Sequence, residues 1–294
     1  MASGYAAKAA AASLLAAVTG LLAQLSFRAG PVPYTMQNAG FILAGLLLPP
    51  KWAFASQLLY LSVIAAGIPL ASGFRGGVAV LLGPTGGYLA GFPLAALLMS
   101  ALRERYLRRA GRGFAELGAR DLAALWLLSA VAAAPVYALG FFVFSYWVSA
   151  DPSLLAWTLR VAGFLGLAKD LRLAVATASV IVFVPQDLLV DHPLALLVAH
   201  RVARAAPSVY EALAGSAKAG ARARIPALIR GRSPAGASSP ASRRVHPSRV
   251  GPRAGPLRGT GRDGGPPPPR ERGLREQQEA GVPLQPRLHR VYEA

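Results

Sequence analysis

The feature that most constrains this chain is a series of apolar stretches that fills its first 200 residues. A helix needs roughly 20 mostly apolar residues to cross about 30 Å of hydrocarbon. The sequence therefore predicts an all-α membrane protein, a six-transmembrane-helix bundle whose second span is short. The expected spans are residues 9–27, 39–48, 52–69, 88–102, 122–148 and 173–199.

Composition divides the chain into two unlike parts. The whole sequence is 54% hydrophobic and only 15% charged, yet its net charge is +18. Residues 1–200 hold 13 Lys and Arg against 7 Asp and Glu, whereas residues 201–294 hold 18 against 6 and 13 of the 24 prolines. We therefore expect a transmembrane substrate-binding domain at 1–205 and a basic Arg/Pro/Gly-rich tail at 206–294. Such a tail cannot bury enough apolar surface to offset its chain entropy, so it should be disordered.

The basic tail has two interpretations. Its charge could attract anionic lipid or RNA, or it could be a solvated appendage without a specific partner. The second interpretation is favoured, so nucleic acid is not an expected partner. The lipid bilayer is an expected partner because of the predicted membrane spans.

The positions of Lys and Arg predict the orientation in the membrane. Positive residues near span ends are retained in the cytoplasm, and the predicted loop 103–120 holds six arginines. An even number of spans places both termini on that side. The first apolar run is interpreted as an uncleaved span, because Gln24, Ser26 and Phe27 stand where a signal peptide needs small residues. The expected location is the cytoplasmic membrane, multi-pass, with both termini cytoplasmic.

Enzyme classes find little support. The chain has no cysteine, which excludes disulfides, thiolate nucleophiles and Cys-ligated metals. Its four histidines show no metal-ligand spacing, no serine lies in a nucleophile elbow, and no acidic pair is recognised within a span. We expect no catalytic residues, no metal and no cofactor, and interpret the chain as a binding protein rather than an enzyme.

Asp187 is the main candidate for a binding residue. It follows Pro185 in the middle of the last apolar segment, where an ionisable side chain is costly and indicates function. A carboxylate beside a helix break could accept hydrogen bonds from a ligand's N–H groups. The alternative is that Pro185 ends one helix and Asp187 caps the next; the functional interpretation is favoured.

Two further polar groups stand out. Thr35, Gln37 and Asn38 precede the short second span, and by sequence alone a water-facing cap is slightly favoured for them. The loop 73–88 is rich in glycine, which lets backbone approach a ligand closely, and includes Arg75, Thr85 and Tyr88. Tyr88 could stack on a flat ring or hydrogen-bond a polar head. This loop is equally consistent with a tight extracellular turn and with a lid.

Three strings in this order resemble one known family. Pro31-Val32-Pro33-Tyr34-Thr35-Met36-Gln37 and Leu82-Gly83-Pro84-Thr85-Gly86-Gly87-Tyr88-Leu89 are similar to strings of the biotin transporter family BioY, the substrate-binding S component of energy-coupling factor (ECF) transporters. The similarity covers residues 6–105 well. It returns at Val184-Pro185-Gln186-Asp187-Leu188-Leu189, where the family has Pro-Gly-Asp-Leu-Leu-Lys. Val190 stands where the family has lysine, and Arg75 could replace that cation.

The resemblance implies high-affinity biotin binding and uptake. Asp187 would accept from the ureido N–H groups, and Thr35, Gln37 and the loop with Thr85 and Tyr88 would line or close the pocket. The first helix, around Ala6 and Ala10, would dock on an ECF transmembrane coupling subunit with two ATPase subunits. The alternatives are an S component for another small vitamin, and a non-transport membrane protein with a nucleic-acid-binding tail.

Overall fold

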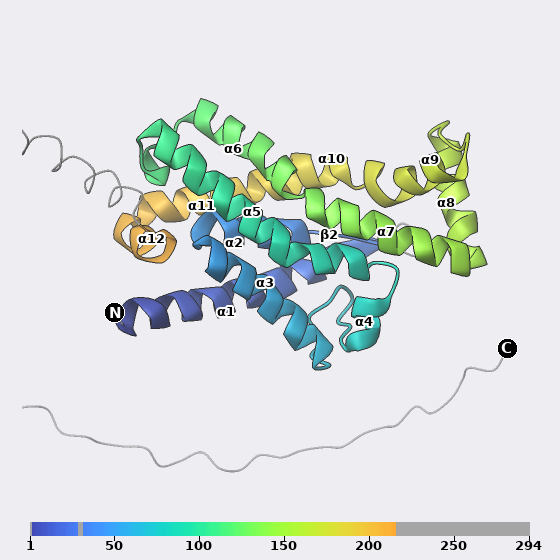
Figure 1. The fold of residues 1–294 in the computed structure, drawn as a ribbon, viewed down its shortest axis with the longest axis horizontal. Helices are drawn as coiled ribbons and strands as arrows, with labels where there is room; N and C mark the ends of the chain where they lie inside the picture. Colours follow the sequence, from blue (N-terminus) through green and yellow to red (C-terminus); the bar gives the residue numbers. More distant parts are fainter. Residues whose placement is uncertain (1, 29–31, 216–294) are drawn as a thin grey trace, which may run out of the picture. The chain divides into compact units, whose positions relative to one another are not determined.

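The protein is described here by a computed structural model that covers residues 2–28 and 32–215, a mostly helical part of the chain (Figure 1). The α-helices are α1 (Ala2–Gln24), α2 (Gln37–Leu47), α3 (Pro50–Ala65), α4 (Val78–Leu82), α5 (Gly86–Ala110), α6 (Ala119–Ala132), α7 (Ala134–Ala150), α8 (Pro152–Phe164), α9 (Leu171–Ala176), α10 (Val184–Gln186), α11 (His192–Ala205) and α12 (Pro207–Ala214). A 3-10 turn η1 (Phe114–Glu116) and two π-helical turns, η2 (Thr177–Ile181) and η3 (Asp187–Asp191), complete the helical segments. Strands β1 (Ser26–Arg28) and β2 (Pro33–Thr35) pair antiparallel.

Helical segments long and apolar enough to cross a membrane occur at three places in the described residues. They are Gly4–Gln24, Ala119–Ala150 and Leu171–Ala205, and they coincide with the first, fifth and sixth predicted spans. The membrane character expected from the sequence is therefore supported. The second predicted span, 39–48, overlaps α2 (Gln37–Leu47), which is a shorter apolar helix as anticipated.

The last span is irregular next to Pro185, in agreement with the interruption expected from the sequence. It runs from Leu171 to Ala205 with η2 and η3 on either side of the short α10, and Val182 and Phe183 form a turn between η2 and α10. A proline removes one backbone donor and crowds the preceding turn. The wider π turns absorb this distortion, and such turns are frequent at functional sites.

The predicted boundary of the tail also shifts. Residues Pro207–Ala214 form α12, because Tyr210 and Ala214 are buried and the Tyr210 ring stacks on Phe114 with centroids 5.3 Å apart. The rest of the predicted tail, 216–294, lies outside the described residues. Helix α12 packs against α1 and α11, at the end of the bundle where α1 begins (Figure 1).

Helix α2 lies at the centre of the bundle. Its 11 residues span about 16 Å at 1.5 Å per residue, about half the hydrocarbon thickness. Phe41, Ile42, Ala44 and Leu46 are fully buried, and α1, α3, α5 and α11 surround the helix. Because both ends of α2 lie inside the protein, its unpaired terminal N–H and C=O groups need protein partners.

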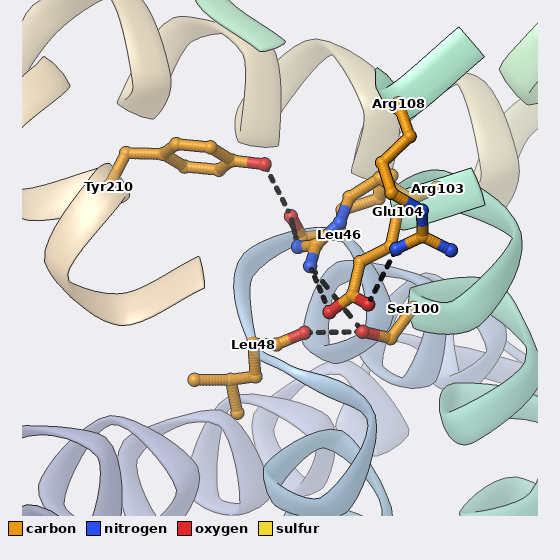
Figure 2. A network of polar contacts seen from close by, with 7 residues as sticks. All are labelled: Leu46, Leu48, Ser100, Arg103, Glu104, Arg108 and Tyr210. Atoms are coloured by element: carbon orange, nitrogen blue, oxygen red, sulfur yellow. Dashed lines mark hydrogen bonds and ion pairs between the residues drawn. The ribbon is translucent and has the colours of Figure 1, made fainter. Parts of the chain in front are cut away.

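Arg103 supplies one of these partners at the C-terminal end of α2 (Figure 2). Its Nη1 donates to the Leu46 carbonyl at 2.6 Å, and the Tyr210 hydroxyl donates to the same oxygen at 3.1 Å. Ser100 Oγ donates to the Leu48 carbonyl at 2.6 Å. The sequence analysis placed Arg103 in an exposed loop, which is wrong. Helix α5 continues to Ala110, and Arg103 is only 1% exposed within it.

Arg103→Ala tests this capping arrangement. A hydrogen bond from a charged group contributes about 1.5–3 kcal/mol, so the free energy of unfolding should fall by that amount. The measurement is a denaturing-detergent titration followed by tryptophan fluorescence. Arg105→Ala is the matched control, because Arg105 lies two residues later on the same helix and is exposed. This substitution should change the free energy of unfolding by no more than about 0.5 kcal/mol. Equal effects of the two substitutions would contradict the capping role.

Candidate ligand-binding cavity

A cavity lies among β2, the loop between α3 and α4, α5, α7 and the distorted part of the last helix. It contains about 670 Å³ of space not filled by atoms, part of it open to solvent. The six residues singled out from the sequence all line it: Thr35, Gln37, Arg75, Thr85, Tyr88 and Asp187. The fold thus brings together side chains up to 152 positions apart in the chain. Their contact with a ligand stays a prediction.

Asp187 is the single acidic residue among the described residues that line this cavity. It begins η3 and is 4% exposed, so it faces neither bulk solvent nor lipid. The Tyr137 hydroxyl, from α7, donates a hydrogen bond to Asp187 Oδ2. Burying a carboxylate is costly unless hydrogen bonds compensate, and the side chain of Asn38 also interacts with Asp187. A carboxylate has about four acceptor sites, so it can accept further hydrogen bonds. A bound N–H group would complete its hydrogen bonding.

Tyr137 was missed by the sequence analysis. It lies inside the apolar run 122–148 with no other polar residue nearby to mark it. Its role depends on the packing of α7 beside the last helix, which no local pattern encodes.

Tyr88 presents its ring to the cavity while its hydroxyl is already used. The hydroxyl donates to the Ser179 carbonyl at 2.6 Å. At this point the helix is irregular, because the Phe183 amide donates to the Val180 carbonyl instead of the Ser179 carbonyl. The freed Ser179 carbonyl is therefore satisfied by Tyr88. Of the two roles considered from the sequence, ring stacking remains available to this residue.

Gln37 connects the cavity wall to the bundle interior. It is 7% exposed, so the water-facing cap considered from the sequence is wrong for this side chain. Its Nε2 donates to the Tyr60 hydroxyl at 2.5 Å, and Thr35 Oγ1 donates to Gln37 Oε1 at 3.0 Å. The first turn of α2 is buried because β2 and the last helix cover it, as the bond from Gln186 Nε2 to the Thr35 carbonyl at 2.9 Å indicates.

Arg75 and Thr85 lie at the side of the cavity formed by the glycine-rich loop. Arg75 is the one basic side chain among the described lining residues, it is exposed, and its Nε donates to the Ser72 carbonyl at 3.1 Å. Thr85 precedes α5, and its side chain makes no capping hydrogen bond. The cavity therefore has a buried acid on the last helix and an exposed cation on a loop.

Asp191 is a buried acid that the sequence analysis overlooked. It follows Asp187 by four positions and is fully buried, so the last span does include an acidic pair. The four-residue spacing, which places two side chains on one helix face, was the available signal. Val190, between them, is 46% exposed and does not line the cavity.

Close packing between α5 and α7 fixes this side of the cavity. A Cβ at Gly87 would clash with the Leu139 carbonyl, and a Cβ at Gly140 would clash with the Tyr88 ring. Glycine at these positions lets the two helices approach closely. The ring of Tyr88 is held in the narrow space between them.

These observations define the class of protein to which the chain belongs. The protein is a helical membrane protein that encloses a small-molecule cavity with a buried carboxylate, and the described residues contain no cluster of His, Asp or Glu suited to a metal ion. A model of the BioY family matches residues 2–208. The chain therefore belongs to the BioY family.

Individual relatives agree with this membership. The chain is 35% identical over 127 residues to "Biotin transporter BioY" of Thermotoga maritima, covering 43% of this chain and 67% of the relative. It is 32% identical over 177 residues to "Biotin transporter BioY" of Rhodobacter capsulatus, covering 60% and 82%. "Probable biotin transporter BioY" of Pyrococcus horikoshii is 50% identical over 86 residues, 29% of this chain and 53% of the relative. The chain thus spans about half the length of some of its curated relatives.

One solved structure is also similar. It is described as the S-component for biotin from an ECF-type ABC transporter, with 22% identity, a TM-score of 0.49, and coverage of 66% of this chain and 89% of the other.

Gly140→Ala tests the packing around Tyr88. The added methyl group must push the Tyr88 ring or separate α5 from α7, and overpacking of this kind costs about 1–3 kcal/mol. The free energy of unfolding should fall accordingly. Gly163→Ala is the matched control, because its Cβ would meet nothing within 4 Å and alanine favours a helix by about 0.5–1 kcal/mol. A Gly140→Ala protein as stable as the control would contradict the close contact.

Proposed function

We propose that this protein binds biotin with high affinity and takes part in its uptake across the membrane as the S component of an ECF-type transporter. The observation that supports this most is Asp187, a buried carboxylate that lines a cavity between helices and lies within an apolar helical segment. The names of the BioY relatives support biotin as the ligand. The protein is a transport component and not an enzyme.

Biotin's chemistry matches the polar groups of the cavity. Its ureido ring offers two N–H donors, which Asp187 would accept, and one carbonyl, which a donor near Thr35 or Gln37 would bind. The Tyr88 and Phe92 rings would cover the apolar faces of the bicyclic head. Its carboxylate tail needs a cation, and Arg75 is the basic side chain available on the described cavity wall. Arg75 would thus serve in place of the lysine that Val190 replaces.

We propose six membrane crossings with both termini in the cytoplasm. The predicted spans fall on α1, α2, α3, α5, the pair α6–α7, and the segment Leu171–Ala205. The arginines near the end of α5 and in the loop before α6 support a cytoplasmic location for that end. The start of α1 and helix α12 lie at the same end of the bundle as the C-terminal end of α5 (Figure 1). The membrane is the cytoplasmic membrane.

The start of α1 is the proposed docking surface for an ECF transmembrane coupling subunit, which would bring two ATPase subunits. Ala6 and Ala10 are exposed on this helix, whereas Ala12 and Ala16 are buried in the bundle. Small residues four positions apart allow close helix packing in membranes. The exposed pair is therefore free to contact a partner helix.

Biotin binding by the purified protein is the first test. Wild type should bind labelled biotin, and Asp187→Asn should bind at least about tenfold more weakly, since losing one charged acceptor costs about 1.5–3 kcal/mol. Asp170→Asn is the matched control, because Asp170 caps α9 through the Leu173 amide and asparagine caps equally well. Riboflavin and thiamine serve as competitors. Their displacement of biotin, or the absence of biotin binding, would favour the alternative of another vitamin.

Arg75→Ala tests the proposed carboxylate contact. If Arg75 binds the tail of biotin, the substitution should weaken biotin binding by about tenfold or more, and should leave the neutral biotin amide nearly unaffected. Arg160→Ala is the control, since Arg160 is exposed and does not line the cavity. An equal loss of affinity for the acid and the amide would contradict the charge pairing.

A further inference from the structure

Two polar side chains near Asp187 on the same helix, Gln186 and Asp191, have no assigned role. We propose that Asp191, together with Gln186, is a positioning residue for the binding site. It fixes the position of the first turn of α2, which bears Gln37 and Asn38, relative to the η3 turn, which bears Asp187. The proposal deepens the proposed function and rests on it for its binding readout.

Gln186 forms the first connection. Its Nε2 donates to the Thr35 carbonyl at 2.9 Å, which ties the last helix to β2 across 151 positions of the chain. Thr35 is followed two residues later by Gln37, whose amide donates to Thr35 Oγ1 at 3.4 Å. The segment that leads into α2 is therefore hydrogen-bonded to Gln186, the residue immediately before Asp187.

Asp191 forms the second connection at the same place. It is fully buried, and η3 packs against α2. Neither carboxylate oxygen has a partner at hydrogen-bonding distance and angle within the described part of the chain. The Asp187 carboxylate repels Asp191, and the side chain of Gln186 and the backbone amides of Ala39 and Asn38 attract it. Asn38 and Ala39 belong to the first turn of α2, the positive end of its dipole.

Helix α2 needs such a partner because its local capping is limited to the bond from the Gln37 amide to Thr35 Oγ1 at 3.4 Å. Its N-cap position is Met36, which makes no side-chain capping bond, and the first four amides of a helix have no partners within the helix. A carboxylate near those amides stabilises the helix end. Asp191 provides this charge from a different helix, so it also fixes where the α2 end lies relative to η3.

The far side of η3 is anchored separately. His192, fully buried, shares a hydrogen bond between its Nδ1 and Ser129 Oγ at 2.8 Å, and Trp126 Nε1 donates to the Leu188 carbonyl at 2.7 Å. Both partners belong to α6. With α6 on one side and α2 on the other, the turn that presents Asp187 is held in one position.

Asp191 acts through this geometry and not by touching the ligand, because it does not line the cavity. A buried charge with incomplete hydrogen bonding destabilises a protein. Replacing Asp191 with an apolar residue should therefore leave the stability of the empty protein unchanged or raise it. Affinity for biotin should fall in the same variant. This separation distinguishes a positioning role from a structural one.

The experiment compares Asp191→Asn, Asp191→Ala and Leu189→Ala in the full-length protein. Leu189 is the control because it lies in the same turn and is 70% exposed. In the alanine variant the uncapped first turn of α2 must be ordered when biotin binds, at a cost of about 1 kcal/mol, so this variant should bind about fivefold to tenfold more weakly. Asparagine is also a good cap, so the asparagine variant should stay within about threefold of wild type. If the alanine variant does not fold, Asp191→Leu takes its place with the same expectation.

Hydrogen exchange of the α2 first turn gives a readout that needs no ligand. The amides of Asn38 and Ala39 should exchange faster in the alanine variant and at the wild-type rate in the asparagine and Leu189 variants. Unchanged exchange, wild-type affinity in the alanine variant, or an equal loss in the asparagine variant would overturn the proposal. If wild type bound no biotin, the proposed function would fail, while the exchange rates would still decide the role of Asp191.

Discussion

The bundle depends on solving one problem, the placement of a short helix inside a membrane protein. Helix α2 is too short to reach both membrane surfaces, so its terminal backbone groups lie among other helices. Water cannot satisfy them there, and each unsatisfied group would cost free energy. Arg103 and Tyr210 satisfy the C-terminal end. The N-terminal end lies beside the cavity, so the same requirement concentrates polar groups around the proposed ligand site.

The last helix shows the same coupling between an irregular backbone and a polar site. The turn at Val182 and Phe183 releases a carbonyl at Ser179, because the Phe183 amide donates to the Val180 carbonyl, and Tyr88 satisfies the Ser179 carbonyl from α5. The π turn η3 bears Asp187, which lies at the cavity wall beside Tyr137. In a regular helix the Ser179 carbonyl would have a partner within the helix and would not need Tyr88. The distortion therefore helps to fix Tyr88 in the cavity wall.

The sequence predicted the parts of this site that are marked by local chemistry. Asp187 stands out because an acid in an apolar segment is costly, and the loop with Arg75 and Tyr88 stands out because of its glycines. The sequence did not predict Tyr137, whose role comes from helix packing. It assigned Arg103 to a loop because charge at the end of an apolar run normally means water. It missed α12 because the burial of Tyr210 depends on Phe114, about 100 residues earlier.

The arrangement of charge limits the orientation of a guest. Asp187 is buried and its remaining acceptor capacity suits neutral N–H donors, whereas exposed Arg75 suits a carboxylate that keeps part of its hydration. A guest with an anionic group at Asp187 would pay both desolvation and like-charge repulsion. A molecule with a hydrogen-bonding neutral head and an acidic tail would therefore bind with its head at Asp187. Since Arg75 is on a loop and Asp187 is on a helix fixed from two sides, the head is the end that such a site discriminates most strictly.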